Sequence, residues 1–161
     1  MLGVLAEQPT HGFAISRQLE AGSELGRVMT VRRPLVYRAL DRLVETGCAE
    51  PTFTERGDGP QRVIHRITHV GRRRLSTWLN RPVEHIRDLR IEFLLKLALL
   101  RRANRSPLEL IRSQRTALGP TLEALDDPAL DPGDHVELWR RHNAVAASNY
   151  LDDLESRYGA V

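Results

Sequence analysis

The chain has 161 residues, of which 41% are hydrophobic and 28% are charged, so it can form one domain or two small ones. Its longest apolar stretch near the middle, Phe93–Leu100, is interrupted by Lys96 and is far too short to span a bilayer. The opening residues Met1–Leu5 contain no basic leader or cleavage site, so no secretory signal is expected. Because Cys48 is the single cysteine, no intrachain disulfide can form, and a cytoplasmic location is expected.

Positive charge is concentrated in the N-terminal half. Residues 1–82 carry 13 arginines and 8 acidic residues, a net charge of +5, whereas residues 83–161 carry 11 basic and 13 acidic residues, a net charge of −2. A GC-rich genome would explain an arginine-rich composition, but it would not place the excess in one half. Arginine presents a planar fork that fits guanine edges and phosphates, so the basic half is the candidate for binding nucleic acid.

Two short helices are expected before residue 31. Leu2–Ala6 is an apolar run that stops near Pro9. A second helix is expected from an N-cap at Thr10 to Gly22, because apolar residues recur between them at helical spacing. The glycines and polar residues of 22–30 predict a turn or a short irregular link.

A third, arginine-rich helix follows residue 31. Pro34 suits the first turn of a helix, because its missing N–H would be unpaired there. Gly47 is the expected end of this helix. Arg32 and Arg33 therefore stand at its N-terminal entrance. The apolar face of the helix consists of Leu35, Ala39, Leu40, Leu43 and Val44.

After Gly47 the pattern changes to that of a β-hairpin. Cys48–Thr54 and Arg62–Ile67 are short segments typical of strands, and the glycines of Gly57–Gly59 between them favour a turn. Pro51 within the first segment indicates an edge strand.

A helix capped by Thr68 closes the first half, and three helices are expected in the second. We place the domain boundary after Pro82. The first of the three helices spans about residues 84–102. The second begins at Ser106, where a serine, a proline and a glutamate form a capping box. The third begins at Asp131, where an N-cap acid precedes a proline.

The basic helix and the basic hairpin together predict a winged helix-turn-helix, whose helix enters the major groove of duplex DNA. Arginines at the start of the helix would reach guanine edges or phosphates, a valine would meet a thymine methyl, and a tyrosine would donate to a phosphate. On the hairpin, charge rather than base identity would dominate. Some of these arginines could instead be solvated or paired with acidic residues of the same helix. The candidate DNA-binding residues are Arg32, Arg33, Val36, Tyr37, Arg38, Arg42, Arg56, Gln61 and Arg62.

The last helix carries an apolar stripe at near-heptad spacing from Val136 to Tyr158, more than one small domain needs to cover its own core. Such a face usually packs on another helix, which the partner chain supplies in a homo-oligomer. Aromatic residues there could also line a pocket for a flat apolar effector, although plain core packing is the alternative we favour. The candidate dimer-interface residues are Phe93, Leu97, Val136, Trp139, Asn143, Ala146, Tyr150 and Leu154, and the candidate effector-pocket residues are Trp78, Trp139 and Tyr150.

Four segments resemble, in order, the motifs of the PadR-like transcriptional regulators. They are Leu2–Glu7 followed by His11–Ile15, then Leu35–Leu43 with Gly47, then Arg66–Arg72, and finally Glu92–Leu99. The resemblance implies a homodimeric regulator, most often a repressor, with an N-terminal winged helix and a helical C-terminal dimerisation region. It also implies that Tyr37 matches a family tyrosine near the DNA backbone.

The chain departs from this family pattern at three points. Arg32–Pro34 replaces the family's small residues before the helix, so the base preference should be this chain's own. His65 stands where the family usually has an aromatic residue, so packing of that strand should differ. Family members also often begin several residues earlier than Met1.

Catalytic and metal sites are not expected. His65 and His69 are four residues apart but straddle a strand-to-helix join, with no cysteine or acidic cluster nearby in sequence. No Ser–His–Asp spacing or Gly-rich phosphate loop occurs. Cys48 is expected to be a small buried residue rather than a redox switch. We therefore expect no cofactor, no metal and no enzymatic activity.

The predicted fold is mainly α with a small two-stranded β-wing. A winged helix-turn-helix DNA-binding domain is expected over residues 1–82, and a helical dimerisation domain, which could also sense an effector, over residues 83–161. The predicted function is a sequence-specific transcriptional regulator, a repressor that binds a palindromic operator as a homodimer and is released by a small molecule. One alternative is a winged helix used as a protein–protein interaction module without specific DNA binding. Another is an enzyme with a catalytic set that the sequence does not reveal.

Overall fold

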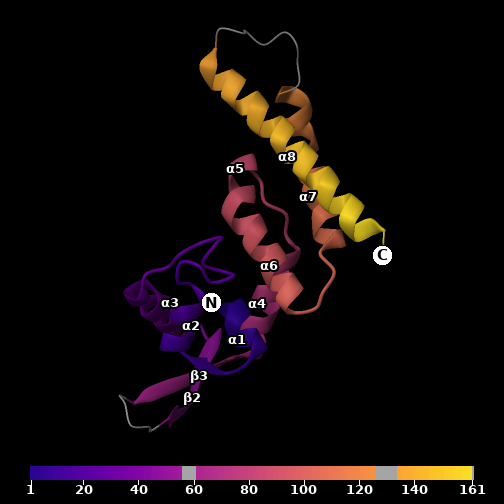
Figure 1. The fold of residues 1–161 in the computed structure, drawn as a ribbon. Coiled ribbons are helices and arrows are strands. Elements are labelled where there is room, and N and C mark those ends of the chain that lie inside the picture. Colours follow the sequence, from indigo (N-terminus) through magenta and orange to yellow (C-terminus); the bar gives the residue numbers. More distant parts are fainter. Residues whose placement is uncertain (56–60, 126–133, 161) are drawn as a thin grey trace. The chain divides into compact units, whose positions relative to one another are not determined.

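The computed structural model describes residues 1–55, 61–125 and 134–160. The chain divides into two compact units, Met1–Leu79 and Asn80–Val161, and Figure 1 traces them from indigo to yellow. Within the described residues the fold is mainly helical with one small antiparallel sheet, so the predicted fold class is confirmed. The roles expected for residues 1–82 and 83–161 remain predictions. The predicted turn at Gly57–Gly59 and the predicted helix start at Asp131 lie outside the described residues.

The N-terminal unit begins with two short helices and a two-residue strand. The N-cap of α2 is His11, whose Nδ1 accepts a hydrogen bond from the Ala14 N–H at 3.0 Å, so the predicted cap at Thr10 is wrong. Thr10 is instead buried in a strand, which delays the start of the helix. The elements of this unit are α1 (Leu2–Glu7), β1 (Thr10–His11), α2 (Gly12–Gln18), α3 (Arg33–Glu45), β2 (Ala49–Glu55), β3 (Arg62–Ile67) and α4 (His69–Asn80).

Helix α3 has the start and the end that the sequence predicts. Pro34 is its second residue, where no backbone donor is needed. At the other end, the Gly47 N–H donates to the Val44 carbonyl at 2.9 Å, and the Cys48 N–H donates to the Leu43 carbonyl at 2.8 Å. This pair of bonds is a Schellman motif, and the φ of +64° at Gly47 explains why a glycine stands there.

The sheet has three strands in the order β1-β3-β2, all antiparallel, rather than the two strands expected. The additional strand is β1, in which Thr10 pairs with His65 and His11 pairs with Ile64. Two residues are too few for a strand periodicity to be recognised in a sequence. β2 lies at the sheet edge, as Pro51 predicts, and its register with β3 shifts beside that proline.

The core of the N-terminal unit lies between α1, α2, α3 and β3, where α2 packs on α3 and α1 packs on β3. Apolar side chains from all four elements are almost fully removed from solvent, and this burial is the main force that holds the unit together. The buried set is Val4, Leu5, Ile15, Leu19, Leu25, Val36, Leu40, Ile64 and Ile67.

The helical unit follows with the elements α5 (Ile86–Asp88), η1 (Leu89–Phe93), α6 (Leu94–Arg102), α7 (Leu108–Leu125) and α8 (His135–Gly159). The single helix expected over residues 84–102 is thus three consecutive pieces, because η1 is a π-helical turn. Leu89 and Phe93 within this turn are both buried. Apolar residues four apart fit an α-helical and a π-helical turn equally well, so the sequence could not distinguish the two.

The starts of the last two helices are set by side-chain caps. The Leu108 N–H donates to the hydroxyl of Ser106 at 3.3 Å, as the capping signal there predicts. α8 begins at His135, where its N-cap Asp134 accepts hydrogen bonds from the Val136 and Glu137 N–H groups.

Helices α7 and α8 lie side by side and antiparallel (Figure 1). Apolar residues of α7 such as Ile111 and Leu118 are fully buried, and Ala144, Ala147 and Leu151 are the buried residues of α8. Along the rim, ion pairs join the helices, for example Arg115–Asp152 at 2.6 Å and Arg112–Glu155 at 3.2 Å. These pairs are largely exposed and add little stability, so the apolar contact carries this packing.

Two buried polar side chains hold the segment of residues 81–83 at the start of the helical unit. Gln114 is 0% exposed, and its amide accepts from the Val83 N–H at 2.7 Å and donates to the Val83 carbonyl at 2.9 Å. Lys96, also 0% exposed, donates to the Arg81 carbonyl at 2.7 Å and pairs with Glu92 at 2.8 Å. Buried polar groups are tolerated only with such partners, so these contacts specify where the segment lies.

We predict that Gln114→Ala destabilises the protein by about 1–3 kcal/mol, because the Val83 N–H and carbonyl would stay buried without partners. Urea denaturation followed by circular dichroism measures the free energy of unfolding. Ser113→Ala, at an exposed neighbouring position of the same helix, is the matched control and should change stability by less than about 0.5 kcal/mol. Equal effects of the two substitutions would contradict this role for Gln114.

Candidate DNA interface

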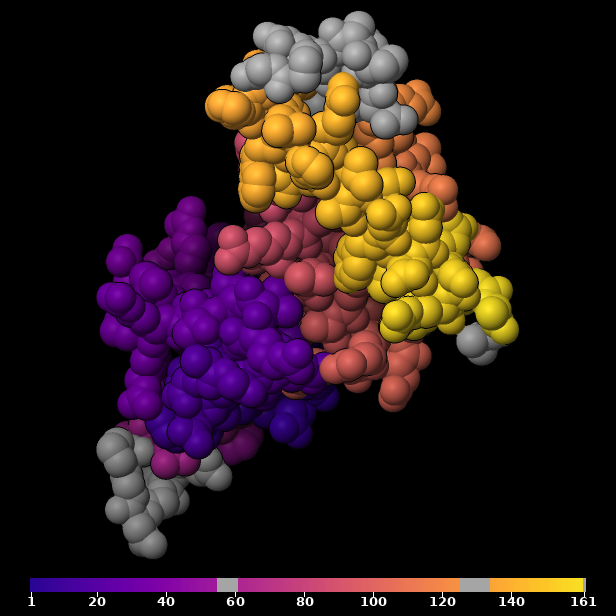
Figure 2. All heavy atoms as spheres, turned by 45° about the horizontal axis from the view of Figure 1, so that its top comes forward, coloured from indigo at the N-terminus to yellow at the C-terminus, as the bar shows by residue number. Residues whose placement is uncertain are grey.

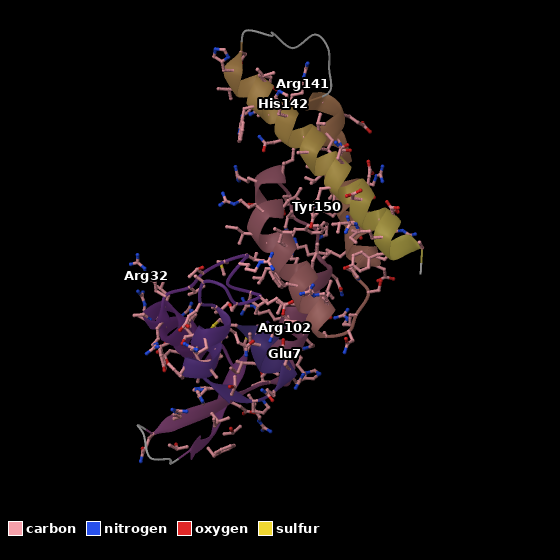
Figure 3. The ribbon with its side chains drawn as sticks, viewed as in Figure 1. Glu7, Arg32, Arg102, Arg141, His142 and Tyr150 are labelled. Carbon is pink, nitrogen blue, oxygen red and sulfur yellow. The ribbon has the colours of Figure 1, made fainter. Side chains whose placement is uncertain are left out.

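Several arginines are exposed at the start of α3 and along it, together with Leu35, Tyr37 and Asp41. Arg32 is the N-cap residue, Arg33 is the first residue of the helix, and Arg38 follows about a turn and a half later. All three are exposed, and Figure 3 shows Arg32 projecting from the N-terminal unit. Among the residues that the structure describes, none of the three forms an ion pair with an acidic side chain.

Arg42 differs from these three arginines. Its Nη1 lies 3.1 Å from a carboxylate oxygen of Glu45, one turn away on the same helix, and both side chains are well exposed. The pairing of helix arginines with nearby acids, which the sequence left open, therefore occurs at this position. An exposed pair of this kind is weak and a phosphate can displace it.

Val36 does not belong to this surface. It is 0% exposed and, with Leu40 at 2%, forms the part of α3 that packs in the core. The prediction that Val36 meets a thymine methyl is therefore wrong. The expected apolar face contained Leu35 and not Val36, but Leu35 is 50% exposed and Val36 is buried with Leu40, so the stripe that packs in the core runs through Val36 instead.

The hairpin contributes two described candidates. Gln61 and Arg62 are exposed, and Arg62 opens β3 opposite Glu55 of β2. Arg56 lies outside the described residues. The start of β3 thus presents a basic side chain at the end of the hairpin away from α4, as a wing requires.

The ring of Phe13, in the first turn of α2, contacts arginines of both α3 and the hairpin. The guanidinium carbon of Arg33 lies 4.7 Å from the ring centroid, and that of Arg62 lies 5.8 Å from it. The ring of His11 is nearly parallel to that of Phe13, with the centroids 6.3 Å apart. Phe13 was missed as a site residue because its two arginine partners lie far from it in sequence.

The ring of Tyr37, a residue of α3, packs against the start of α2. A Cβ atom built on Gly12 would lie 2.7 Å from Cε1 of Tyr37, so the ring lies directly over this glycine. The residue as a whole is still 44% exposed. The start of α2 therefore carries contacts to Tyr37, Arg33 and Arg62 at once.

The candidate dimer-interface residues divide into exposed and buried ones. Val136 and Trp139 are 61% and 70% exposed, and Ala146 is exposed as well, on a helix that lies at the surface along most of its length in Figure 2. Phe93 is 0% exposed within the single chain, so its inclusion in a dimer surface is wrong. The side chains of Leu97, Asn143, Tyr150 and Leu154 are partly exposed.

The effector pocket expected at Trp78, Trp139 and Tyr150 remains a prediction. Trp139 and Tyr150 are separated by eleven positions on α8, which is about 16 Å along a helix axis, and Trp78 belongs to α4. A cavity of about 350 Å³ lies between α7 and α8, lined by residues that include Leu122, Arg141 and Val145. None of the three aromatic candidates lines it.

The described residues also bear on two other classes of site, metal centres and membrane-spanning helices. No group of three or more histidine, cysteine, aspartate or glutamate side chains is placed to hold a metal ion within residues 1–55, 61–125 and 134–160. In the same ranges, no helix has the length and apolar character to cross a membrane. Cys48 is buried, as expected.

Comparison with known proteins gives a family match for the N-terminal unit. Residues 1–77 match the family described as "Transcriptional regulator PadR-like family", which confirms the resemblance noted in the sequence. A search of curated proteins found no match.

Two solved structures are similar to this chain at low identity. PadR of Bacillus subtilis in complex with operator DNA is 20% identical, with a TM-score of 0.49 over 98% of this chain and 94% of the other. The protein smu.1604c of Streptococcus mutans UA159 is also 20% identical, with a TM-score of 0.45 over 97% of this chain and 94% of the other.

We predict that Gly12→Ala lowers the free energy of unfolding by about 1–3 kcal/mol, because the new methyl group overlaps the Tyr37 ring. In a Tyr37→Ala background the overlap is gone, and the same substitution should be neutral or stabilise by up to about 1 kcal/mol, as alanine normally does in a helix. Urea denaturation of the four proteins measures this coupling. An equal effect in both backgrounds would show that Tyr37 does not lie over Gly12.

Proposed function

Residues 1–77 of this chain belong to the PadR-like family of transcriptional regulators, and on that premise we propose that the protein is a sequence-specific repressor. It binds a palindromic DNA operator as a homodimer. The observation that carries the proposal is the arginine surface at the start of α3, where Arg32, Arg33 and Arg38 are exposed without acidic partners among the described residues.

The first turns of α3 suit entry into a major groove. Val36 and Leu40 hold one side of the helix in the core, and Arg38 lies on the opposite side, pointing outwards from a rigid element. Arg32 and Arg33 stand at the N-terminal end of the helix and are exposed there. An arginine in this position donates two parallel hydrogen bonds to a guanine edge or to a phosphate. We assign base reading to Arg38, which stands within the helix, and backbone contacts to Arg42, Tyr37, Gln61 and Arg62 at its flanks.

The dimer in this proposal is formed through α8. At about 100° per residue, Val136, Trp139, Asn143 and Ala146 lie on one face of α8, separate from the face of Ala144 and Ala147 that is buried in the chain. A second copy of α8 would remove the exposed apolar residues of this face from water. Two recognition helices related by the two-fold axis would then read the two halves of the operator.

Repression would follow from occupation of the promoter, and a small molecule would release it. Such an effector acts only if it binds two dimer shapes with different affinity. The cavity between α7 and α8 has a volume in the range of small-molecule sites. It lies on α8, so a ligand there would act on the helix that the proposed dimer uses.

We predict that Arg38→Ala weakens binding to the operator by about 1–3 kcal/mol and relaxes the preference at one base pair, because a bidentate contact to a base is lost. The measurement is fluorescence anisotropy with duplexes from the promoter of the protein's own coding region, titrated between about 50 and 200 mM salt. A specific complex that weakens steeply with salt is expected for the wild-type chain.

Arg17→Ala is the matched control, since it removes the same charge from an exposed position of α2 that pairs with Glu20. Its binding should stay close to that of the wild type. If Arg38→Ala reduced affinity equally on every duplex, Arg38 would contact phosphate rather than a base. Weak, sequence-indifferent binding by the wild-type chain would favour the protein-interaction module instead.

We predict that Trp139→Asp converts the dimer into a monomer at micromolar concentration, because a charge would be buried at the centre of the apolar face. Light scattering coupled to gel filtration measures the mass. Leu138→Asp is the control, since Leu138 is 43% exposed and lies on a different side of α8. A wild-type chain that is monomeric in this measurement would refute the homodimer.

A further inference from the structure

We propose that Phe13 is a positioning residue, which holds Arg33 and Arg62 together as one clamp for the DNA backbone. The two arginines come from different elements, the first turn of α3 and the first residue of β3. The inference rests on the proposed function, because it explains how that surface is arranged before DNA arrives.

The contacts place both cations against a single ring. The guanidinium carbons of Arg33 and Arg62 lie 4.7 and 5.8 Å from the Phe13 centroid. Because both distances share that point, the two carbons are no more than about 10.5 Å apart.

Two positive charges at this separation repel each other, and the repulsion is not fully screened at physiological salt. The π-face of an aromatic ring is negative and attracts a guanidinium at an exposed site. Phe13 therefore offsets part of the repulsion in the free protein. A leucine of similar apolar character would fill the space without providing this attraction.

The ring itself is held in place by α2. Phe13 lies in the first turn of that helix, whose start is fixed by the His11 cap and the buried Ile15. The stacked ring of His11 flanks Phe13. Because the ring is anchored, it restricts two arginine side chains that would otherwise lose rotamer freedom on binding DNA.

A phosphate is the ligand that this pair fits. Each guanidinium presents N–H donors that fit a phosphate, and two such groups on one support suit a stretch of DNA backbone, whose contacts position the protein on the duplex. The clamp should therefore strengthen binding to every duplex and fix the angle between α3 and the hairpin on the DNA.

The experiment compares Phe13→Leu, Phe13→Trp and the wild-type chain by fluorescence anisotropy on a promoter duplex and on a duplex of scrambled sequence. Phe13→Leu should bind both duplexes about 3- to 30-fold more weakly, with a salt dependence reduced by about one counterion. Phe13→Trp should retain wild-type affinity, since tryptophan is the stronger cation–π partner. Thermal unfolding of each free protein verifies that the variants are folded.

A second comparison separates positioning from packing. In an Arg33→Ala/Arg62→Ala background, Phe13→Leu should have no further effect on duplex affinity, because the residues it positions are absent. Fluorinated phenylalanines at position 13 keep the ring shape while weakening its negative face, so affinity should fall as fluorine atoms are added. This series stays informative even if Phe13→Leu does not fold.

The inference is overturned if Phe13→Leu binds DNA like the wild type, or if Phe13→Leu still lowers duplex affinity in the double-alanine background. It is also overturned if duplex affinity does not change as fluorine atoms are added to the ring. In each of these cases the wild-type chain still binds DNA and the proposed function stands. A wild-type chain that binds neither duplex overturns the proposed function and this inference together.

Discussion

The orientation of α3 depends on the burial of Val36 and Leu40. These two side chains are almost completely removed from solvent, and burial of one aliphatic side chain stabilises a fold by roughly 1.5–3 kcal/mol. The same contact decides which side of the helix faces outwards. Arg38 is exposed because it lies on the side of the helix opposite these two residues, whereas Arg32 and Arg33 are exposed at its N-terminal end. The proposed DNA surface is thus a consequence of core packing.

Helix α2 acts as a second support for that surface. Its first residues lie under Tyr37 and beside Arg33 and Arg62, so the short helix contacts both α3 and the hairpin. In sequence these residues form three separate segments. A rigid common support is what allows side chains from separate elements to act on one ligand, since loose side chains would lose more entropy on binding.

The helical unit uses a different principle to hold its first segment. The fully buried side chains of Gln114 and Lys96 form hydrogen bonds to the backbone of Val83 and of Arg81, respectively. Hydrogen bonds to buried polar partners are directional, so they specify one register where apolar packing alone would tolerate several. Lys96 is the only lysine in the chain, and its pairing with Glu92 satisfies a charge that would otherwise be costly to bury.

Local features of this protein follow from short stretches of its sequence. The start of α3 at Pro34, its end at Gly47, the edge position of β2 and the capped start of α7 all follow from the chemistry of one or a few neighbouring residues. The basic N-terminal half and the family motifs can also be recognised from the sequence, because they depend only on composition and on residue order. Val36 is the candidate DNA-binding residue that this local view misplaced, because it lies in the core.

Which of these residues contact one another depends on the tertiary structure. It added the strand β1, which is too short to have a pattern of its own, and the π-helical turn of η1, whose apolar spacing also fits an α-helix. It buried Phe93 within the chain and left Trp139 exposed. Above all, it brought Phe13 to Arg33 and Arg62. Contacts between residues distant in the chain are set by how the elements pack, and neither periodicity nor spacing encodes that packing directly.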